Sequence, residues 1–418
     1  MLLEIIVEAW NALKRNVTRS LLTMLGIVWG IATVTLLIAY GNSFRQILVG
    51  GFDAFGKSVV ICWPQQTSEQ PGGQRAGKKV VFEKADLDMV KETAPLVKHV
   101  CLETVRRPGI AYEDRMVGTA AIRGVCPEYG EMRNEVPSEG RWIDSGDELE
   151  RRRVCFLGGR IREQLFSGRP AIGETVLIGG VRFTVIGVMA RKIQLSNYFS
   201  SDDESVWIPY SAAGDMWDTR YAAVMVFEPI APQFEKAAMA QVLAAVATRQ
   251  QFSTTDKKAI QMFGRDEFRP VIDGLTIGLQ VLLTFIGTLT LGIGGVGVMN
   301  IMLVSVDERI REIGLRRALG AKKSQIKFQF LAETLLIMMI GGAIGVALSY
   351  VIAVAVGTLP MMGPMFEDES GKGDIHLRIS IITVTLSTIV LLLVGVLSGM
   401  VPAMRASKLD PVEALRYE

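Results

Sequence analysis

Two short stretches of the chain match phosphate-binding patterns letter for letter, but neither has the context that phosphate binding requires. Residues 51–58 (GFDAFGKS) fit G-x-x-x-x-G-K-[ST], which holds phosphates when a strand precedes it and a helix follows. Here a helical pattern precedes the motif and a strand pattern follows it. Residues 292–297 (GIGGVG) fit G-x-G-x-x-G, yet they lie within a long apolar stretch without a βαβ pattern. We therefore expect neither motif to bind a nucleotide.

The residue types that usually perform catalysis are also poorly placed. The two histidines, His99 and His376, are far apart, so neither a metal cluster nor a histidine-based triad can be built from them locally. The sequence offers no credible Ser/His/Asp set and no carboxylate pair for acid–base chemistry. We predict that the chain is not an enzyme and that it has no cofactor and no metal site.

The cysteines of the chain could be either disulfide-bonded or reduced. The four cysteines all lie in the segment 42–272, and they are Cys62, Cys101, Cys126 and Cys155. In an oxidising compartment they could pair in three ways, whereas the alternative is a set of reduced, buried thiols. Because no C-x-x-C occurs, zinc binding and thioredoxin-like chemistry are not expected.

The composition indicates a membrane protein. The chain has 418 residues, of which 49% are hydrophobic, and its mean hydropathy is +0.31. The formal net charge is only +2, which does not suggest a nucleic-acid partner. The apolar run that begins at residue 21 is about 20 residues long, too long for the core of a signal peptide, so we expect an uncleaved anchor.

Four apolar stretches are long enough to cross a bilayer. We expect spans at 21–41, 273–306, 328–358 and 379–401. The uncharged part of the second stretch would rise about 48 Å as a helix, more than the ~30 Å hydrocarbon core, so its N-terminal end should project as a stalk. Pro402 is expected to stop the last span.

Charge fixes the expected orientation of these spans. The loop 307–327 is rich in arginine and lysine, which places it in the cytoplasm by the positive-inside rule. Both termini should then be cytoplasmic, with a short interfacial helix at 1–20 and a basic tail at 402–418. The acidic loop 359–378 should lie outside.

The segment 42–272 differs in composition and predicts a folded extracytoplasmic domain. Its alternating apolar patterns indicate a mixed α+β fold of two subdomains. One should be split between 57–136 and 216–265, and the other, mostly β, inserted at 137–215. We predict a hairpin on Gly179-Gly180, helices at 84–94 and 233–248, and strands at 57–63, 97–106, 116–124, 153–157, 175–178, 182–189, 205–209, 222–227 and 259–263.

Small residues four positions apart recur in the spans, where they allow helix backbones to approach closely. The pairs are Gly26/Gly30, Gly274/Gly278, Gly341/Gly345 and Gly395/Gly399. They could pack one four-helix bundle or form a dimer face, and both interpretations stay open. Glu333 is the only clearly embedded ionisable residue, so the spans resemble rods that join two sides more than a polar conduit.

The loop between the second and third spans predicts a charged helix at 307–319. Glu308 and Glu312, and Glu312 and Arg316, are four residues apart and share a face, and Gly320 is placed to cap the end. The helix is either a solvated topological anchor or a docking surface for a cytoplasmic motor. The residues of that candidate surface are Asp307, Glu308, Arg309, Arg311, Glu312, Arg316 and Arg317.

Several motifs in order along the chain resemble the MacB/FtsX-type permeases of ATP-binding-cassette transporters. They are residues 16–27 (NVTRSLLTMLGI), 299–309 (MNIMLVSVDER), 311–314, 317–321 and 402–417, with 140–142, 181–188 and 206–210 in the domain between the first two spans. The resemblance covers essentially the whole chain and favours the docking interpretation of 307–319.

This resemblance implies a bacterial inner-membrane permease subunit that forms a dimer with itself or with a paralogue. An ATPase would bind the cytoplasmic loop and drive stalk movements that export or extract a hydrophobic or peptide-like substrate, with membrane lipids around it and a possible periplasmic adaptor. Macrolide-exporting members carry the ATPase at the N-terminus of the same chain, whereas this sequence starts at the surface helix, so we expect a separate ATPase subunit. The alternatives are a regulator of an extracytoplasmic partner, such as a cell-wall hydrolase or a peptide sensor, and a membrane-anchored binding protein without energy coupling.

Overall fold

The computed structural model describes residues 17–53, 56, 59–69, 76–190, 192, 194, 197–362 and 373–416. The chain divides into two compact units. The helical unit comprises Met1–Ile47, Gly274–Met361 and Asp374–Glu418, and the α+β unit comprises Leu48–Asp273 and Met362–Gly373. The predicted interfacial helix at 1–20 falls mostly outside the described residues.

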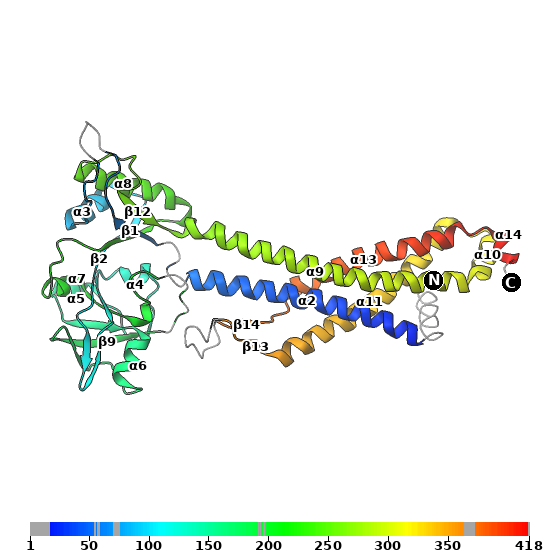
Figure 1. Ribbon diagram of the computed structural model, residues 1–418, viewed down its shortest axis with the longest axis horizontal. Helices are drawn as coiled ribbons and strands as arrows, with labels where there is room; N and C mark the ends of the chain where they lie inside the picture. The colour runs from blue at the N-terminus through cyan, green and yellow to red at the C-terminus, as the bar shows by residue number, and fades with distance from the viewer. Residues whose placement is uncertain are drawn as a thin grey trace. The chain divides into compact units, whose positions relative to one another are not determined.

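Four long helices make up most of the helical unit (Figure 1). They are α2 (Val17–Asp53), α9 (Arg265–Glu308), α11 (Lys323–Val356) and α13 (Ile381–Lys408). Each contains a stretch long and apolar enough to cross a membrane, which confirms the predicted four spans. Helix α9 has 44 residues and therefore rises about 66 Å, far more than one hydrocarbon core.

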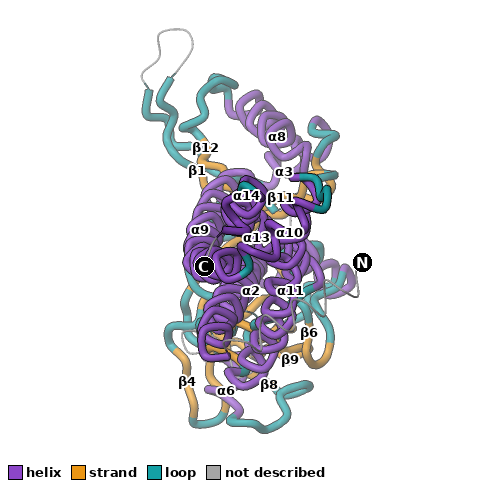
Figure 2. The backbone as a smooth tube through the Cα atoms, turned by 90° about the vertical axis from the view of Figure 1, so that its right-hand side faces the viewer, coloured by secondary structure: helices purple, strands orange, loops and turns teal. Residues whose placement is uncertain are grey.

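Buried apolar side chains from all four helices form one core along the bundle. The cluster includes Ile27 and Ile31 of α2, Leu291 of α9, Met338 of α11 and Leu391 of α13. In Figure 2, which looks along the bundle, these helices surround a common centre. A two-stranded sheet of β13 (Thr358–Leu359) and β14 (Ile375–His376) links α11 to α13.

The prediction that Pro402 ends the last span is wrong. Pro402 is buried inside α13, which continues to Lys408. A proline costs one helical hydrogen bond, but membrane helices tolerate it where neighbouring helices pack against the site. Here Ala403 and Ala406 remain in the bundle core beyond the proline, and this packing holds the last turns in place.

One layer of the α+β unit is an antiparallel sheet covered by two helices. Its strands run in the order β12 (Ile260–Phe263), β1 (Val60–Pro64), β11 (Val224–Pro229) and β2 (Val97–Arg106). Helices α3 (Lys84–Thr93) and α8 (Glu235–Gln250) lie against it in Figure 1. Val90 of α3 and Val242 of α8 share a buried cluster with strand residues such as Met225 and Phe227.

The sheet continues through β2 into a second, mixed set of strands. The order is β2, β5 (Ala121–Val125), β10 (Ser205–Pro209), β7 (Val154–Leu157), β9 (Val181–Met189), β8 (Thr175–Ile178), β3 (Ile110–Tyr112) and β4 (Arg115–Val117), with β6 (Pro137–Gly140) beside β9. Strand β2 pairs with β11 at its start and with β5 from Thr104 onward, so it belongs to both halves. Short helices α4 (Tyr129–Met132), α5 (Ser145–Leu149), α6 (Gly159–Phe166) and α7 (Tyr210–Gly214) connect these strands.

The strand predictions agree closely with the structure, whereas the subdomain boundary does not. Strands β2, β8 and β10 have the predicted bounds, and Gly179 and Gly180 form the hairpin turn with φ of 55° and 85°. The predicted strand 116–124 is two strands, β4 and β5. Ile110 and Ile122 pack into the core of the second half, so that half begins before the predicted residue 137.

The two phosphate-motif matches have the expected contexts. Helix α2 ends at Asp53 and β1 begins at Val60, so a helix precedes the first motif and a strand follows it. The second motif lies inside α9. Neither arrangement resembles a phosphate-binding loop.

Candidate functional site between helices α9 and α11

A short helix, α10 (Ile310–Ala318), connects the second and third spans. The prediction of one continuous helix at 307–319 is wrong, because α9 ends at Glu308 and Arg309 is non-helical (φ −110°, ψ 16°). Asp307 and Glu308 therefore end a membrane helix. The sequence has no glycine or proline at this break, and the contacts that accompany it come from distant residues.

Helix α10 packs against the last helix of the chain, α14 (Pro411–Arg416), at one end of the bundle (Figure 1). Ile313 and Gly314 are its buried residues. A Cβ atom on Gly314 would lie 2.6 Å from the Cβ of Ala414 in α14, so glycine is what permits this close approach. Gly320 ends the helical turn with φ of 101°, as expected of a capping glycine.

Two arginines of the predicted surface face inward and anchor α10. Arg317 Nη1 donates to the carbonyl oxygens of Ser407 and Leu409, at 3.0 Å each, and so joins α10 to the end of α13. Arg309 Nη1 lies 3.4 Å from the Glu333 carboxylate of α11. These arginines support the position of α10 and are not a free docking face.

The remaining predicted residues are more exposed. Glu308, Arg311 and Glu312 are exposed, and Glu312 pairs with Arg316 at 2.7 Å on the helix surface. Asp307 pairs with Arg405 of α13 at 3.1 Å, with both side chains about half exposed. Such surface pairs contribute at most about 1 kcal/mol each, so their charges stay available to a partner.

Sequence reasoning missed the apolar part of this surface. Leu315 and Leu319 are 52% and 81% exposed on one face of the α10 region, and Val412 of α14 is 65% exposed. Exposed apolar side chains among charged residues are typical of a protein interaction site. The four-residue spacing of Leu315 and Leu319 could have indicated it. We call Glu308, Arg311, Glu312, Leu315, Leu319 and Val412 the α10 surface.

The glycine pairs have partners within the same chain. Cβ atoms added at Gly26 and Gly30 would meet α9, at Gly341 and Gly345 they would meet α2, and at Gly395 and Gly399 they would meet α11. These six positions thus pack the bundle. Gly274 and Gly278 differ, since an added Cβ would meet nothing within 4 Å.

The structure joins Cys101 to Cys126, with Cα atoms 5.8 Å apart. The bond lies beside the β2–β5 pairing. Cys62 and Cys155 are free and buried, and burial raises the pKa of both thiols well above the ordinary range. They are poorly suited to thiolate chemistry.

A buried network of charges in the α+β unit was also missed. Arg123 of β5 is fully buried, and its guanidinium lies 3.0 Å from the Glu103 carboxylate. Its Nη2 atom donates to the carbonyl oxygens of Tyr198 and Ser200 at 2.9 Å. Burial alone would lower the pKa of Arg123, but Glu103, Tyr129, Tyr198 and Asp202 together outweigh it, so the pKa is raised. Arg123 therefore stays charged and fastens the segment before β10 to the sheet.

A second part of this network surrounds Asp202. Arg133 Nη2 lies 3.1 Å from its carboxylate, and Lys192 Nζ lies 2.8 Å from Asp202 and 3.0 Å from Glu135. Burial would raise the pKa of Asp202, but Lys192, Arg133 and Arg123 together hold it well below the ordinary value. Burial and the nearby Asp202 charge raise the pKa of Glu135 to about 8. This buried network of ion pairs holds the segments together, and removing one charged partner should destabilise the fold.

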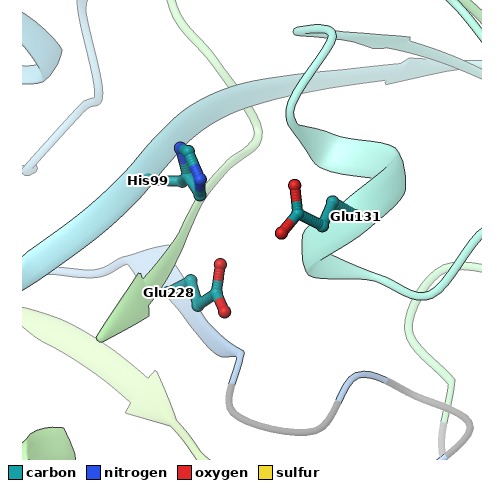
Figure 3. Close-up of side chains that lie close together, drawn as sticks. All are labelled: His99, Glu131 and Glu228. Carbon is teal, nitrogen blue, oxygen red and sulfur yellow. The ribbon is translucent and has the colours of Figure 1, made fainter. Parts of the chain in front are cut away.

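His99 has acidic neighbours that its sequence position does not reveal (Figure 3). His99 of β2 pairs in register with Glu228 of β11, and Glu131 of α4 completes a group whose possible ligand atoms lie within 4.8 Å of one another. Lys98 Nζ already lies 3.0 Å from Glu131 and 3.4 Å from Glu228. Because Lys98 balances both carboxylates, we interpret this group as a surface ion-pair cluster.

These features define a class of membrane protein. An α+β domain lies between the first and second of four membrane-spanning helices, and a short charged helix joins the second to the third, as in the permeases of ATP-binding-cassette transporters. Residues 20–249 match the MacB-like periplasmic core domain, and residues 284–411 match the FtsX-like permease C-terminal domain. The chain belongs to this MacB-type permease family, and it is an inner-membrane protein with an extracytoplasmic domain.

Curated relatives match over nearly the whole chain. The macrolide export ATP-binding/permease protein MacB of Hahella chejuensis is 31% identical over 98% of this chain and 59% of its own length. MacB of Escherichia coli K12 is 33% identical over 99% of this chain and 61% of its own length. The chain thus spans about 60% of the length of these relatives. The periplasmic region of MacB from Actinobacillus actinomycetemcomitans, a solved structure, has a TM-score of 0.43 and 14% identity over 55% of this chain and 98% of its own.

Proposed function

We propose that this chain is the permease subunit of a mechanotransmission transporter. A separate ATPase subunit binds the α10 surface, and ATP hydrolysis there moves the helices that lead to the extracytoplasmic domain. The observation that carries this proposal is the α10 surface itself. Leu315 and Leu319 in the α10 region and Val412 of α14 are exposed among charged residues. Arg317 holds α10 in place by hydrogen bonds to Ser407 and Leu409.

The scarcity of buried charged side chains in the spans supports a transporter that acts on its substrate outside the bilayer. Among the residues that the structure describes, Glu333 is the one charged side chain buried in the helical unit, and it is paired. Conduits for polar solutes usually contain several such groups. Helix α9, by contrast, is long enough to extend well beyond the hydrocarbon core. We therefore propose that the spans transmit movement and do not form a path for substrate.

A face of α9 supports a dimer of permease subunits. Large apolar side chains recur there at alternating three- and four-residue intervals together with Gly278 and Gly292, as in a coiled-coil seam. The exposed members are Leu275, Leu282, Phe285, Leu289 and Val296, between 51% and 64% exposed. We propose that this seam packs against α9 of a second copy or of a paralogue.

The relatives suggest the class of substrate. Their name describes macrolide export, so we propose export or extraction of a hydrophobic or peptide-like substrate, with a periplasmic adaptor as a further partner. The α10 surface and both termini would then lie in the cytoplasm, and the α+β unit would lie outside.

The test is an affinity purification of the full chain from native membranes in mild detergent. The variants are Leu319→Asp, Glu312→Lys and, as a matched control, Leu149→Asp, because Leu149 of α5 is 83% exposed in the α+β unit. We expect a stoichiometric ATPase with the wild type and with Leu149→Asp, and its loss with the α10 variants. Absence of any ATPase from the wild type, or its equal retention in all variants, would overturn the proposal. Stimulation of the ATPase by a protein partner instead of a small molecule would indicate the regulatory alternative.

A further inference from the structure

An acidic side chain occupies a core position of α11. Glu333 is 2% exposed, and it shares the buried stripe of this helix with Ile326, Phe330 and Ile337. A carboxylate among apolar groups is costly unless it is paired. Ionisable residues in membrane-spanning helices are rare and usually have a function.

One partner of Glu333 is the residue at the break between α9 and α10. Arg309 Nη1 lies 3.4 Å from Glu333 Oε2, and the arginine side chain is only 16% exposed. The backbone N–H of Arg309 donates to Val306 of α9 at 3.2 Å, and its carbonyl accepts from Ile313 of α10 at 3.0 Å. One residue therefore ends α9, begins α10 and contacts α11.

Apolar side chains from several helices pack at this end of the bundle. Val306, Ile313 and Phe330 belong to one buried cluster together with Ala403 of α13. Apolar contacts have no directional preference. A charge-assisted hydrogen bond is directional and specifies one relative position. The Arg309–Glu333 pair is thus a directional contact between the α9–α10 junction and α11, in addition to the apolar packing.

We propose that Arg309 and Glu333 are a positioning pair that transmits displacement of α10 to α11 as well as to α9. This inference rests on the proposed function, since it is the bound ATPase that displaces α10. The backbone joins α10 to α9 at Arg309 and to α11 through residues 319–322, and the ion pair adds a direct contact between the Arg309 junction and the buried face of α11. Without the pair, α10 remains joined to α11 by residues 319–322, but less of its movement reaches the face of α11 that carries Glu333.

A second ion pair at the same end of α9 offers a matched control. Asp307 and Arg405 lie 3.1 Å apart, but their side chains are 46% and 55% exposed. An exposed pair of this kind contributes little and sets no register. Asp307→Asn therefore removes one acidic charge two residues from Arg309 without touching the buried pair.

The experiment measures ATP-dependent hydrogen–deuterium exchange in the full chain with its co-purified ATPase, in lipid nanodiscs. The variants are Glu333→Gln, the charge exchange Arg309→Glu/Glu333→Arg, and Asp307→Asn. In the wild type and in Asp307→Asn, we expect ATP to change exchange in peptides from the first turns of α11 and from the N-terminal turns of α9. In Glu333→Gln, the ATPase should stay bound and active, and the change in α9 should persist while that in α11 is clearly reduced. The charge exchange should restore it.

Two results would overturn the inference while the proposed function stands. One is that ATP changes hydrogen–deuterium exchange in α11 of Glu333→Gln as much as it does in the wild type. The other is loss of ATPase binding or thermal stability in Glu333→Gln that the charge exchange fails to restore, which would make the pair merely structural. If no ATPase accompanies the wild type, the proposed function fails and this inference fails with it.

Discussion

Gly314 of α10 lies so close to Ala414 of α14 that a Cβ atom on the glycine would come within 2.6 Å of the alanine Cβ. Gly314 is buried, and Ala414 is 2% exposed. No methyl group fits into that space unless one helix moves away. This contact fixes the tail of the chain beside the helix that we propose as the docking element.

The first prediction tests this contact. Gly314→Ala should loosen α14, because overpacking typically costs about 1–3 kcal/mol, and amide hydrogens of 412–416 should exchange faster. Adding Ala414→Gly removes the opposing methyl group and should restore protection. Hydrogen–deuterium exchange of the full chain provides the measurement. Unchanged protection in the single variant, or no recovery in the double variant, would show that the two helices do not depend on this contact.

The second prediction concerns Gly345 of α11. An added Cβ would lie 1.8 Å from Ile31 Cγ2 and 2.7 Å from the Val28 carbonyl oxygen of α2. Gly345→Ala should therefore destabilise the bundle by about 1–3 kcal/mol, despite the higher helix propensity of alanine. Gly274→Ala is the control, because an added Cβ there meets nothing within 4 Å. Thermal unfolding in detergent should rank Gly345→Ala clearly below the wild type and Gly274→Ala at or above it. The reverse order would refute the α2–α11 packing.

The fold was predictable where local pattern and tertiary environment agree. The hairpin turn on Gly179-Gly180 and the strand at 205–209 have strong local signals, and both lie where they were predicted. Pro402 shows the opposite case. Its local signal ends a helix, but packing around the following alanines continues α13 to Lys408. Tertiary contacts outweighed the local preference there.

The candidate site was only partly predictable for the same reason. The charged face of α10 is visible in the sequence, because helical spacing places Glu312 and Arg316 together. The break at Arg309 is not visible in the sequence, because the ion-pair partner Glu333 lies on another helix. Arg123 likewise sits within a short apolar strand, and its partner Glu103 comes from the neighbouring strand β2. Ion-pair partners that are distant in the sequence and meet only in the fold produce no local sequence pattern.

The third prediction concerns pH and Glu135. Burial and the Asp202 charge raise the pKa of Glu135 to about 8, above its unfolded value of roughly 4.3. The folded state therefore binds more protons between these values, so its stability should fall as pH rises from about 5 to 8. The lowered pKa of Asp202 makes stability rise with pH instead. This effect is confined to pH values below about 4, where the carboxyl group of the unfolded chain becomes protonated.

Glu135→Gln mimics the protonated side chain and should flatten this dependence. The measurement is thermal unfolding of the full chain at several values between pH 5 and 8, followed by tryptophan fluorescence, because Trp207 lies in the core of the α+β unit and Trp142 packs against that core. Glu150→Gln, at a glutamate with a 62% exposed side chain, should keep the wild-type slope. The same slope in Glu135→Gln and the wild type would mean that Glu135 is ionised throughout.

The fourth prediction tests the proposed orientation by labelling introduced cysteines. The native cysteines suit this experiment because they should react weakly. Cys101 is bonded to Cys126, while Cys62 and Cys155 are buried, so a membrane-impermeant maleimide should label the wild type weakly. Leu319→Cys and Leu149→Cys each add an exposed thiol, since the native leucines are 81% and 83% exposed. In intact spheroplasts, we expect Cys labelling at position 149 and none at 319.

Permeabilising the membrane should make position 319 react as fast as position 149, because both sites are similarly exposed in the folded chain. That result places α10 on the cytoplasmic side, where an ATPase has access to ATP, and the α+β unit on the other side. Labelling at 319 in intact spheroplasts would place α10 outside. The docking proposal would then fail on topology alone, since the positive charge of this loop would no longer face the cytoplasm.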